Sequence, residues 1–501
     1  MSITSINTLR SQNRWWINEE AIYKDRYIAQ KEASAAKWSP RIKHFFKFDE
    51  DVVYTLRGPR QVGKTTLVKE LIKELIEKSR VNGRRIFYWT CDLISGPKEL
   101  ALLLETYIEW ARKTFPADRL FIFLDEISSV KDWQKGIKFL VDTGRLQNCT
   151  LILTGSHSLD IRRASERLPG RRGKVADVLD KILLPMKFAE YIDVRHKGVR
   201  EVILDLDLLA RVNRQRILFS LADGEIPSEI EELNLYSTEL LSLLDDYLIT
   251  GGIATAIDSY VSRGEISPQV YETYIRVMLG DAMRWDKKET YMAQVVRRLI
   301  ETMGTRVSWK ALWKGTDLGS HHTVAEYVDV LESSFVVSII YQLDRSKNAP
   351  DYSKDKKIHF QDPFLFHSLR SWVFSLDPYE ASLEYLDDIE NKARLLECVI
   401  CNHLIRLAFA LFPSSEYDYR RKVMYWKGRR DKEVDFTLKV DNKYVPIEVK
   451  FRKEIPKKEL SGLYNFMKGG GSSKGIVITK DLLKSDKNLI FIPAYLFLVI
   501  I

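Results

Sequence analysis

Cysteine is scarce in this chain, and so are the long apolar runs that a membrane helix requires. Four cysteines among 501 residues cannot supply a disulfide framework for a protein of this size. Cys398 and Cys401 have C-x-x-C spacing, but no second pair completes a zinc site, and their apolar surroundings favour core packing. The most apolar stretch, Leu489 to Ile501, is shorter than the ~20 residues of a membrane helix, so we expect a buried last strand there.

The beginning of the chain also lacks the apolar central stretch of a secretory signal, which favours a cytoplasmic protein without a membrane partner. Apolar residues make up 45% and charged residues 29% of the sequence, which is ordinary globular usage and excludes a disordered chain. The formal charge of +9 favours an anionic partner, although it is spread over a large chain. The length is sufficient for several domains.

Short β-branched or aromatic runs alternate with helical patterns from residue 51 to about residue 191, which predicts an α/β fold with a parallel sheet. The expected strands are Val52 to Arg57, Arg85 to Thr90, Leu120 to Leu124 and Thr150 to Thr154. The expected helices between them are Thr65 to Glu77, Lys98 to Phe115 and Trp133 to Thr143. The first predicted domain covers residues 1–200 and includes an N-terminal extension.

Three further domains are predicted after this α/β region. Residues 201–292 keep a 3.6-residue apolar period and form a helical lid region. Residues 293–375 combine three helices with a β-ribbon, Val336 to Gln342 and Lys357 to Gln361, which suggests a winged helix-turn-helix. The polar loop of this ribbon is expected to contain Arg345, Lys347, Lys354 and Lys356. Residues 376–501 follow the order helix, three strands, helix and strand.

A phosphate-binding loop follows the first predicted strand. Residues 58–65 fit the pattern G-x-x-x-x-G-K-T at every fixed position, between a strand and a helix. Glycines let the backbone wrap around phosphates, and the helix N-terminus adds a favourable dipole. Lys64 should reach the β- and γ-phosphates of ATP, and the Thr65 hydroxyl should ligate Mg²⁺. The residues expected to bind the nucleotide are Gly58, Pro59, Arg60, Gln61, Val62, Gly63, Lys64, Thr65 and Thr66.

The second part of the same site follows the end of the apolar strand Leu120 to Leu124. Asp125 is expected to hold Mg²⁺, and Glu126 to polarise the attacking water as a general base. Ser156 follows the next strand and would lie beside the γ-phosphate if that strand lies between the two motif strands. Arg171 and its neighbour Arg172 offer fixed cations that could stabilise transition-state charge, or simply form a solvated basic loop.

With these motifs in place, the chain resembles the AAA+-type ATPases of archaea and bacteria that join a P-loop domain to a winged helix and a restriction-endonuclease-like C-terminal domain. The resemblance spans nearly the whole chain. Its segments are 38–42, 57–66, 124–127, 154–156, 168–171, 184–191, 251–252, 323–331, 360–362, 396–397, 433–436 and 447–450. It implies an extra strand between the two nucleotide motifs, a helical lid, and polar sensing by the turn at Thr154 to Ser156.

The C-terminal domain carries a candidate nuclease site. Asp435 lies on one predicted strand, and Glu448 and Lys450 lie two apart on the next, so the last two point to one face. This pattern matches the D…E-x-K motif of metal-dependent nucleases, in which Asp435, Glu448 and Glu397 would hold Mg²⁺ while Lys450 positions the attacking water. The alternative is a nuclease-like scaffold that binds without turnover.

Basic and aromatic residues interleave from Tyr419 to Lys432, which suits a nucleic-acid backbone, although a solvated hairpin is the ordinary alternative. The first functional hypothesis is therefore an ATP-hydrolysing DNA-processing protein with a metal-dependent nuclease. The second is an ATP-dependent switch or adaptor with a non-catalytic nuclease-like scaffold. ATP and Mg²⁺ are the expected cofactors, DNA is the expected partner, and assembly into a homo-oligomer is left open.

Overall fold

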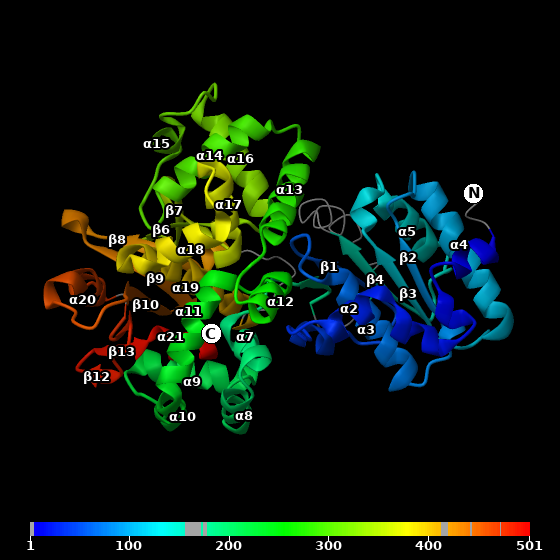
Figure 1. Cartoon of the computed structure of the whole chain (residues 1–501), viewed down its shortest axis with the longest axis horizontal. Coiled ribbons are helices and arrows are strands. Elements are labelled where there is room, and N and C mark those ends of the chain that lie inside the picture. The colour runs from blue at the N-terminus through cyan, green and yellow to red at the C-terminus, as the bar shows by residue number, and fades with distance from the viewer. Residues whose placement is uncertain (1–4, 156–171, 174–177, 412–418, 441–442, 471) are drawn as a thin grey trace. The chain divides into compact units, whose positions relative to one another are not determined.

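The computed structural model describes residues 5–155, 172–173, 178–411, 419–440, 443–470 and 472–501 (Figure 1). Two compact units make up the chain, Met1–Leu184 and Pro185–Ile501. The finer division into four domains stays a prediction.

The first unit is built on a parallel sheet, which within the described residues has five strands in the order β2-β3-β4-β1-β5. The strands are β1 (Val52–Arg57), β2 (Ile86–Thr90), β3 (Leu120–Asp125), β4 (Cys149–Gly155) and β5 (Asp180–Ile182). The four strands predicted from the sequence are confirmed to within one residue at each end. Because β4 lies between β1 and β3, the extra strand implied by the family resemblance is also confirmed.

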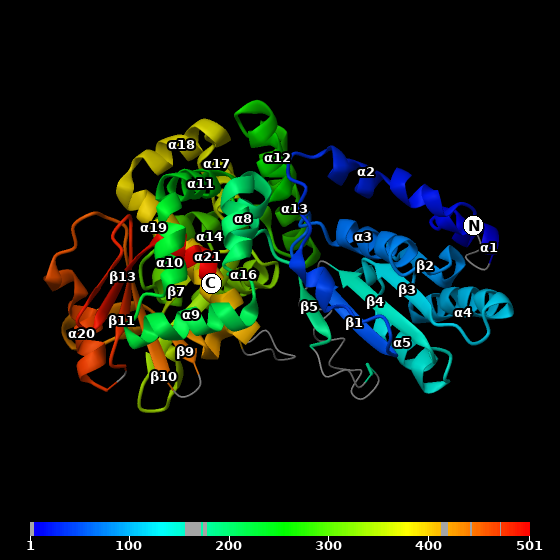
Figure 2. The same ribbon diagram turned by 90° about the horizontal axis from the view of Figure 1, so that it is seen from below.

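Helices cover both faces of this sheet. They are α2 (Arg26–Ala33), α3 (Lys64–Glu77), α4 (Pro97–Thr114) and α5 (Trp133–Asp142). The step from β1 to β2 runs across the sheet in one direction, and the steps from β2 to β3 and from β3 to β4 run in the opposite direction. Because such crossovers are right-handed, α3 lies on one face of the sheet and α4 and α5 lie on the other. Figure 2 shows α2 and α3 together on one side of the strands and α5 on the other.

An N-terminal segment, which includes α1 (Ile6–Arg10), covers the free edge of β2. The Asn13 side chain donates to the carbonyl oxygen of Tyr88 (2.9 Å) and accepts from its backbone N–H (2.7 Å), as a neighbouring strand would. The Gln12 amide oxygen accepts from the backbone N–H of Thr90 at 2.9 Å. Asn13 is fully buried, so these contacts satisfy edge groups that water does not reach.

The second unit is built on a mixed sheet, in which the described residues form eight strands in the order β12-β13-β11-β10-β9-β8-β6-β7. The strands are β6 (Val337–Asp344), β7 (Ala349–Phe360), β8 (Val423–Lys427), β9 (Glu433–Val440), β10 (Lys443–Lys450), β11 (Gly475–Thr479), β12 (Lys484–Asp486) and β13 (Leu489–Pro493). Since β6 pairs with β8, the predicted ribbon extends the C-terminal sheet. A winged helix and a nuclease-like fold stay predictions.

Helices surround this sheet, and the longest of them, α19 (Ile389–Leu411), packs against β7, β8, β9 and β10. The helices before it are α7 (Phe188–Arg195), α8 (Lys197–Asp205), α9 (Arg211–Asp223), α10 (Ser228–Leu233), α11 (Ser237–Thr250), α12 (Ala254–Arg263), α13 (Pro268–Arg284), α14 (Glu289–Glu301), α15 (Trp309–Trp313), α16 (His321–Ser333), α17 (Pro363–Phe374) and α18 (Pro378–Asp387). After it come α20 (Ser461–Lys468) and α21 (Ala494–Ile500). The predicted helical region before residue 292 is thus confirmed.

Two local predictions were wrong. The stretch Leu489 to Ile501 was expected to be one strand, but the strand β13 ends at Pro493 and α21 follows it. Lys354 and Lys356 were expected in a polar loop, but β7 begins at Ala349 and includes both. Their charges indicated a loop, whereas Lys356 is buried and lies over the Trp309 ring at 4.3 Å.

A buried carboxylate joins the glycine pair after α11 to the start of α17. Asp362 accepts hydrogen bonds from the backbone N–H of Gly252 (2.7 Å) and from that of Phe364 (2.9 Å), and so caps α17. Gly251 has φ 56°, and a Cβ on it would lie 2.0 Å from a carboxylate oxygen of Asp362. These residues, which contribute to the family resemblance, therefore join the turn between α11 and α12 to the start of α17.

Among the described residues, no single helix is both long enough and apolar enough to cross a membrane. The bent pair formed by Ser228–Thr250 and Ala254–Arg263 satisfies the same test by length and composition only.

Candidate functional site

The phosphate-binding loop connects β1 to α3 through backbone conformations that favour glycine. Gly63 has φ 101° immediately before the first residue of α3. Gly58 has φ 156°, and a Cβ on it would lie 2.0 Å from the carbonyl oxygen of Leu183. Gln61 also has a positive φ, 61°. The sequence pattern and the backbone therefore agree on a tight turn that directs backbone N–H groups toward an anion at the N-terminus of α3.

Lys64 lies folded against this loop. Its ammonium donates to the carbonyl oxygens of Gly58 at 3.0 Å and Pro59 at 2.9 Å, and the residue is only 5% exposed. Charge-assisted hydrogen bonds to phosphate oxygens are stronger than bonds to neutral carbonyls. The lysine is thus held within the loop where a bound phosphate would be its better partner.

Asp125, at the end of β3, is the centre of a buried hydrogen-bond cluster. One carboxylate oxygen accepts from the Thr65 hydroxyl at 2.7 Å and from the Tyr88 hydroxyl at 3.0 Å. The other oxygen accepts from the Thr154 hydroxyl. The cluster brings together side chains from α3, β2, β3 and β4, so the two predicted Mg²⁺ ligands, Thr65 and Asp125, do lie side by side.

Glu126 follows Asp125 in a left-handed conformation, with φ 53° and ψ 43°. Non-glycine residues adopt this conformation rarely, and it costs of the order of 1–3 kcal/mol unless other contacts hold it. Here the backbone N–H of Glu126 donates to the Thr154 hydroxyl at 3.1 Å. Thr154 thereby fixes both acidic residues, a role that follows from the central position of β4.

Tyr88 contributes to the site without having been predicted. Burial and the neighbouring Asp125 raise the pKa of the Tyr88 hydroxyl, so it stays a hydrogen-bond donor. No motif identifies it, because an aromatic residue in an apolar strand ordinarily indicates core packing.

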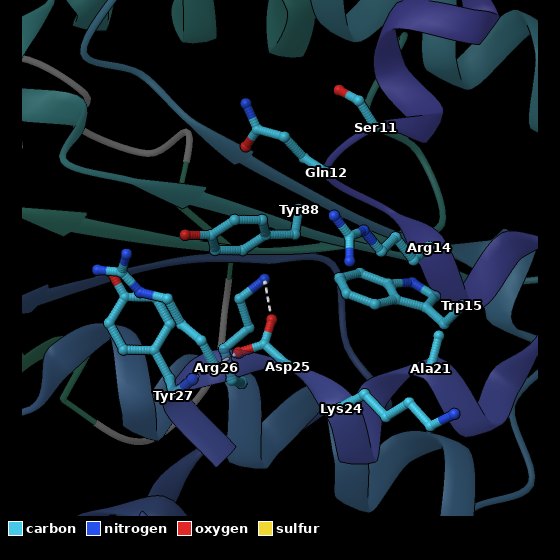
Figure 3. Close-up of a pocket in the computed structure, with 11 residues that line it drawn as sticks. Ser11, Gln12, Arg14, Trp15, Ala21, Lys24, Asp25, Arg26, Tyr27 and Tyr88 are labelled. Atoms are coloured by element: carbon cyan, nitrogen blue, oxygen red, sulfur yellow. Dashed lines mark hydrogen bonds and ion pairs between the residues drawn. The ribbon is translucent and has the colours of Figure 1, made fainter. Parts of the chain in front are cut away.

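Tyr88 also lines a pocket of about 290 Å³ (Figure 3). Trp15, Tyr27 and Asp25 from the N-terminal segment line it. The Lys69 ammonium lies 3.2 Å from Asp25 and 3.3 Å from the centre of the Tyr88 ring, and burial lowers the pKa of Lys69 although Asp25 opposes the shift. Tyr88 therefore links this pocket to the Asp125 cluster.

Ser156 and Arg171, two of the predicted site residues, lie outside the described residues. Arg172 is described, and it contacts the sheet. Its guanidinium bonds the carbonyl oxygen of Val53 (3.1 Å) and forms an ion pair with Asp180 (3.0 Å). Although burial opposes ionisation of Asp180, the charge of Arg172 lowers the pKa of that carboxyl. Arg172 thus joins β1 to β5.

The predicted C-terminal residues converge in the second unit. Asp435 on β9 accepts from the backbone N–H of Val449 at 3.0 Å, and its own N–H donates to Glu448 at 3.3 Å. Lys450 on β10 lies 2.6 Å from Glu448. Burial raises the pKa of the Glu448 carboxyl, whereas Lys357 and Lys450 outweigh burial and lower the pKa of Asp435. The D…E-x-K residues therefore lie together in one partly buried cluster, in which Glu448 and Lys450 share a face as their spacing predicts.

Lys357, which the sequence did not single out, lies at the centre of these carboxylates. Its ammonium is 3.0 Å from Asp435, 2.7 Å from Glu433 and 3.2 Å from Glu397. Burial raises the pKa of Glu397 although Lys357 opposes the rise. Within the described part of the chain, no group of three His, Cys, Asp or Glu side chains is arranged to hold a metal ion.

The interleaved basic and aromatic segment is less open than its sequence suggests. Tyr425 is fully buried and Tyr419 is 8% exposed, so neither ring offers a surface on which a base could stack. Arg420 forms an ion pair with Glu332, whereas Arg429 and Arg430 are exposed. The third ring, Trp426, is partly buried against Phe466, so the segment offers mainly exposed cations.

Comparisons with known proteins agree with the first site. Residues 50–192 match a family model described as an AAA domain. Residues 241–375 and 392–497 match two models described as domains of unknown function, DUF8612 and DUF4143. No curated protein matches the chain. Together with the loop and sheet geometry, the first match identifies a P-loop ATPase-like domain in the first unit.

Several solved structures are similar at low identity. A Walker-type ATPase of Pyrococcus abyssi is 12% identical with a TM-score of 0.37, over 64% of this chain and 91% of that one. The ORC1 protein of Aeropyrum pernix, solved in complex with DNA, is 13% identical with a TM-score of 0.29, over 66% and 88%. PCH-2 of C. elegans is 14% identical with a TM-score of 0.21, over 44% and 61%. Such scores establish neither a common fold nor a common function.

Proposed function

We propose that the first unit hydrolyses ATP with Mg²⁺, and that the nucleotide state switches how the second unit engages DNA. The observation that carries the ATPase proposal is the contact between Thr65, in the first turn after the loop, and Asp125, at the end of β3. This contact joins the phosphate-binding motif to the acidic motif in one buried cluster.

The donors in this cluster fit Mg²⁺, which prefers oxygen ligands and retains several waters. The Thr65 hydroxyl and the Asp125 carboxylate would hold the ion, which when bound neutralises charge on the β- and γ-phosphates. Lys64 would exchange its carbonyl partners for phosphate oxygens. Glu126 would orient the attacking water and accept its proton, while Ser156 and Arg171 would contact the γ-phosphate.

A pair of variants tests the ATPase proposal. Lys64→Ala should abolish nucleotide binding, because the loop loses its fixed cation, whereas Glu126→Gln should bind ATP and lose turnover. Binding is measured by fluorescence titration with a labelled ATP analogue, and turnover by phosphate release. Wild-type turnover by the Glu126→Gln protein would exclude Glu126 as the base.

For the second unit, the geometry favours the switch over the nuclease. The carboxylates expected to hold a metal are already ion-paired with lysines of the same unit. The overall charge of +9 and the exposed cations Arg429 and Arg430 support an anionic partner such as DNA. A panel of labelled branched, single-stranded and duplex DNA, with Mg²⁺ or Mn²⁺ and with or without ATP, separates the two functions. ATP-dependent binding without cleavage is expected, and cleavage that depends on Asp435 would favour the nuclease.

A further inference from the structure

Lys357 places a cation where a nuclease of the predicted class would hold its metal. It lies on β7, and the carboxylates around it come from α19 and β9, which are distant in sequence. A lysine ammonium has three N–H donors. Each of Glu397, Glu433 and Asp435 lies within 3.2 Å of this nitrogen, so one carboxylate is available for each donor.

The ammonium of Lys357 is buried, its carboxylate partners are partly buried, and its charge is compensated. The Lys357 side chain is 2% exposed, and a buried ammonium is costly unless it is paired and hydrogen-bonded. Arg306 lies 2.6 Å from the second oxygen of Glu433, which balances the carboxylate that approaches Lys357 most closely. The ammonium is therefore an integral part of the core rather than a surface side chain that has folded inward.

Both oxygens of Asp435 and both oxygens of Glu448 accept hydrogen bonds within the protein. One oxygen of Asp435 faces Lys357, and the other accepts from the backbone N–H of Val449. One oxygen of Glu448 faces Lys450 at 2.6 Å, and the other accepts from the backbone N–H of Asp435. A divalent ion at Asp435 would also be repelled by the ammonium beside it.

We propose that the Lys357 ammonium replaces the divalent cation of this nuclease-like site, so that the second unit neither binds Mg²⁺ or Mn²⁺ at Asp435 nor cleaves DNA. The proposal deepens the proposed switch function, because it gives a physical reason why the scaffold does not turn over. It makes Lys357 the residue that distinguishes this site from a metal-dependent one with the same D…E-x-K residues.

Manganese binding to the full chain without nucleotide tests the proposal directly. Free and bound Mn²⁺ are distinguished by electron paramagnetic resonance, and Asp435→Asn serves as the control that removes a ligand but keeps the shape. Wild type and Asp435→Asn should bind the same amount of Mn²⁺. Binding by wild type that Asp435→Asn abolishes would overturn the proposal, whatever the behaviour of any Lys357 variant.

Removing the ammonium should open the site. Lys357→Met keeps a long side chain without charge, and Lys357→Gln keeps a polar end. We expect at least one of these proteins to gain one Mn²⁺ per chain, and Lys357→Met/Asp435→Asn to lose it. If both Lys357 variants keep the wild-type circular dichroism spectrum and neither gains a site, the proposal is wrong.

ATP hydrolysis is followed in the same preparations to separate the two claims. Absence of hydrolysis by wild type would contradict the proposed ATPase, with no consequence for Lys357. DNA cleavage by wild type that requires Asp435 would contradict the role of Lys357 and leave the ATPase intact.

Discussion

Replacing Asp362 with asparagine measures how much the buried carboxylate lowers the free energy of unfolding of the second unit. Asp362 is 2% exposed, and burial raises the pKa of its carboxyl from 3.8 to about 6, although bonds from Gly252 and Phe364 oppose the rise. One pKa unit corresponds to about 1.4 kcal/mol, so the ionised carboxylate destabilises the folded unit by about 3 kcal/mol. Because the folded pKa lies above the unfolded one, this penalty is absent below pH 3.8 and complete above about pH 6.

The variant has no charge to bury, and any hydrogen bond that its amide loses is lost at every pH. Relative to the variant, the free energy of unfolding of wild type should therefore fall by about 3 kcal/mol between about pH 4 and pH 7. Urea denaturation followed by circular dichroism at several pH values measures this difference. A difference between the two proteins that does not change with pH would refute burial of the charge as the cause.

Three further predictions concern the first unit. Arg171→Ala should lower the rate of ATP hydrolysis by ~10³ to 10⁵ if Arg171 is an arginine finger. Activity regained when this variant is mixed with Glu126→Gln subunits would place the finger across a subunit interface. Near wild-type turnover by Arg171→Ala alone would exclude the finger role. Arg172→Ala should lower the melting temperature of the first unit far more than its turnover, since Arg172 bonds Val53 and Asp180; unchanged melting would contradict this. Tyr88→Phe should weaken activation by Mg²⁺ several-fold, because one hydrogen bond to Asp125 is worth about 0.5–1.5 kcal/mol, and an unchanged Mg²⁺ titration would count against the contact.

The sequence predicted the first unit well because its elements carry strong local patterns. Strands such as Val52–Arg57 are short apolar runs, each separated from the next by an amphipathic helix. The loop at residues 58–65 can be recognised without long-range information, since its glycines and its lysine lie within one short segment. The position of β4 beside β3 followed only from the family resemblance, because no local pattern states which strands pair.

The sequence was less informative where partners are distant. Lys357 is locally only a charged residue in a predicted ribbon, and two of its three carboxylate partners, Glu397 and Asp435, lie 40 and 78 residues further along the chain. The strand prediction for Leu489 to Ile501 was wrong for a different reason. An apolar run that is buried on all sides has no periodicity to separate a strand from a helix, so the turn into α21 at Pro493 could not be placed.

The side chains that cover the edge of β2 have a consequence for truncated forms of the protein. Asn13 and Gln12 occupy the backbone groups with which a strand of another molecule would otherwise pair. A protein trimmed by proteolysis to begin near Ile17 would expose that edge, together with the apolar residues that Trp15 and Trp16 now cover. Such a fragment should self-associate through β2, and because β2 also carries Tyr88, the association should disturb the contact with Asp125. The N-terminal segment thus covers one edge of the sheet and, through the Tyr88 backbone, also supports the strand from which the Tyr88 hydroxyl reaches Asp125.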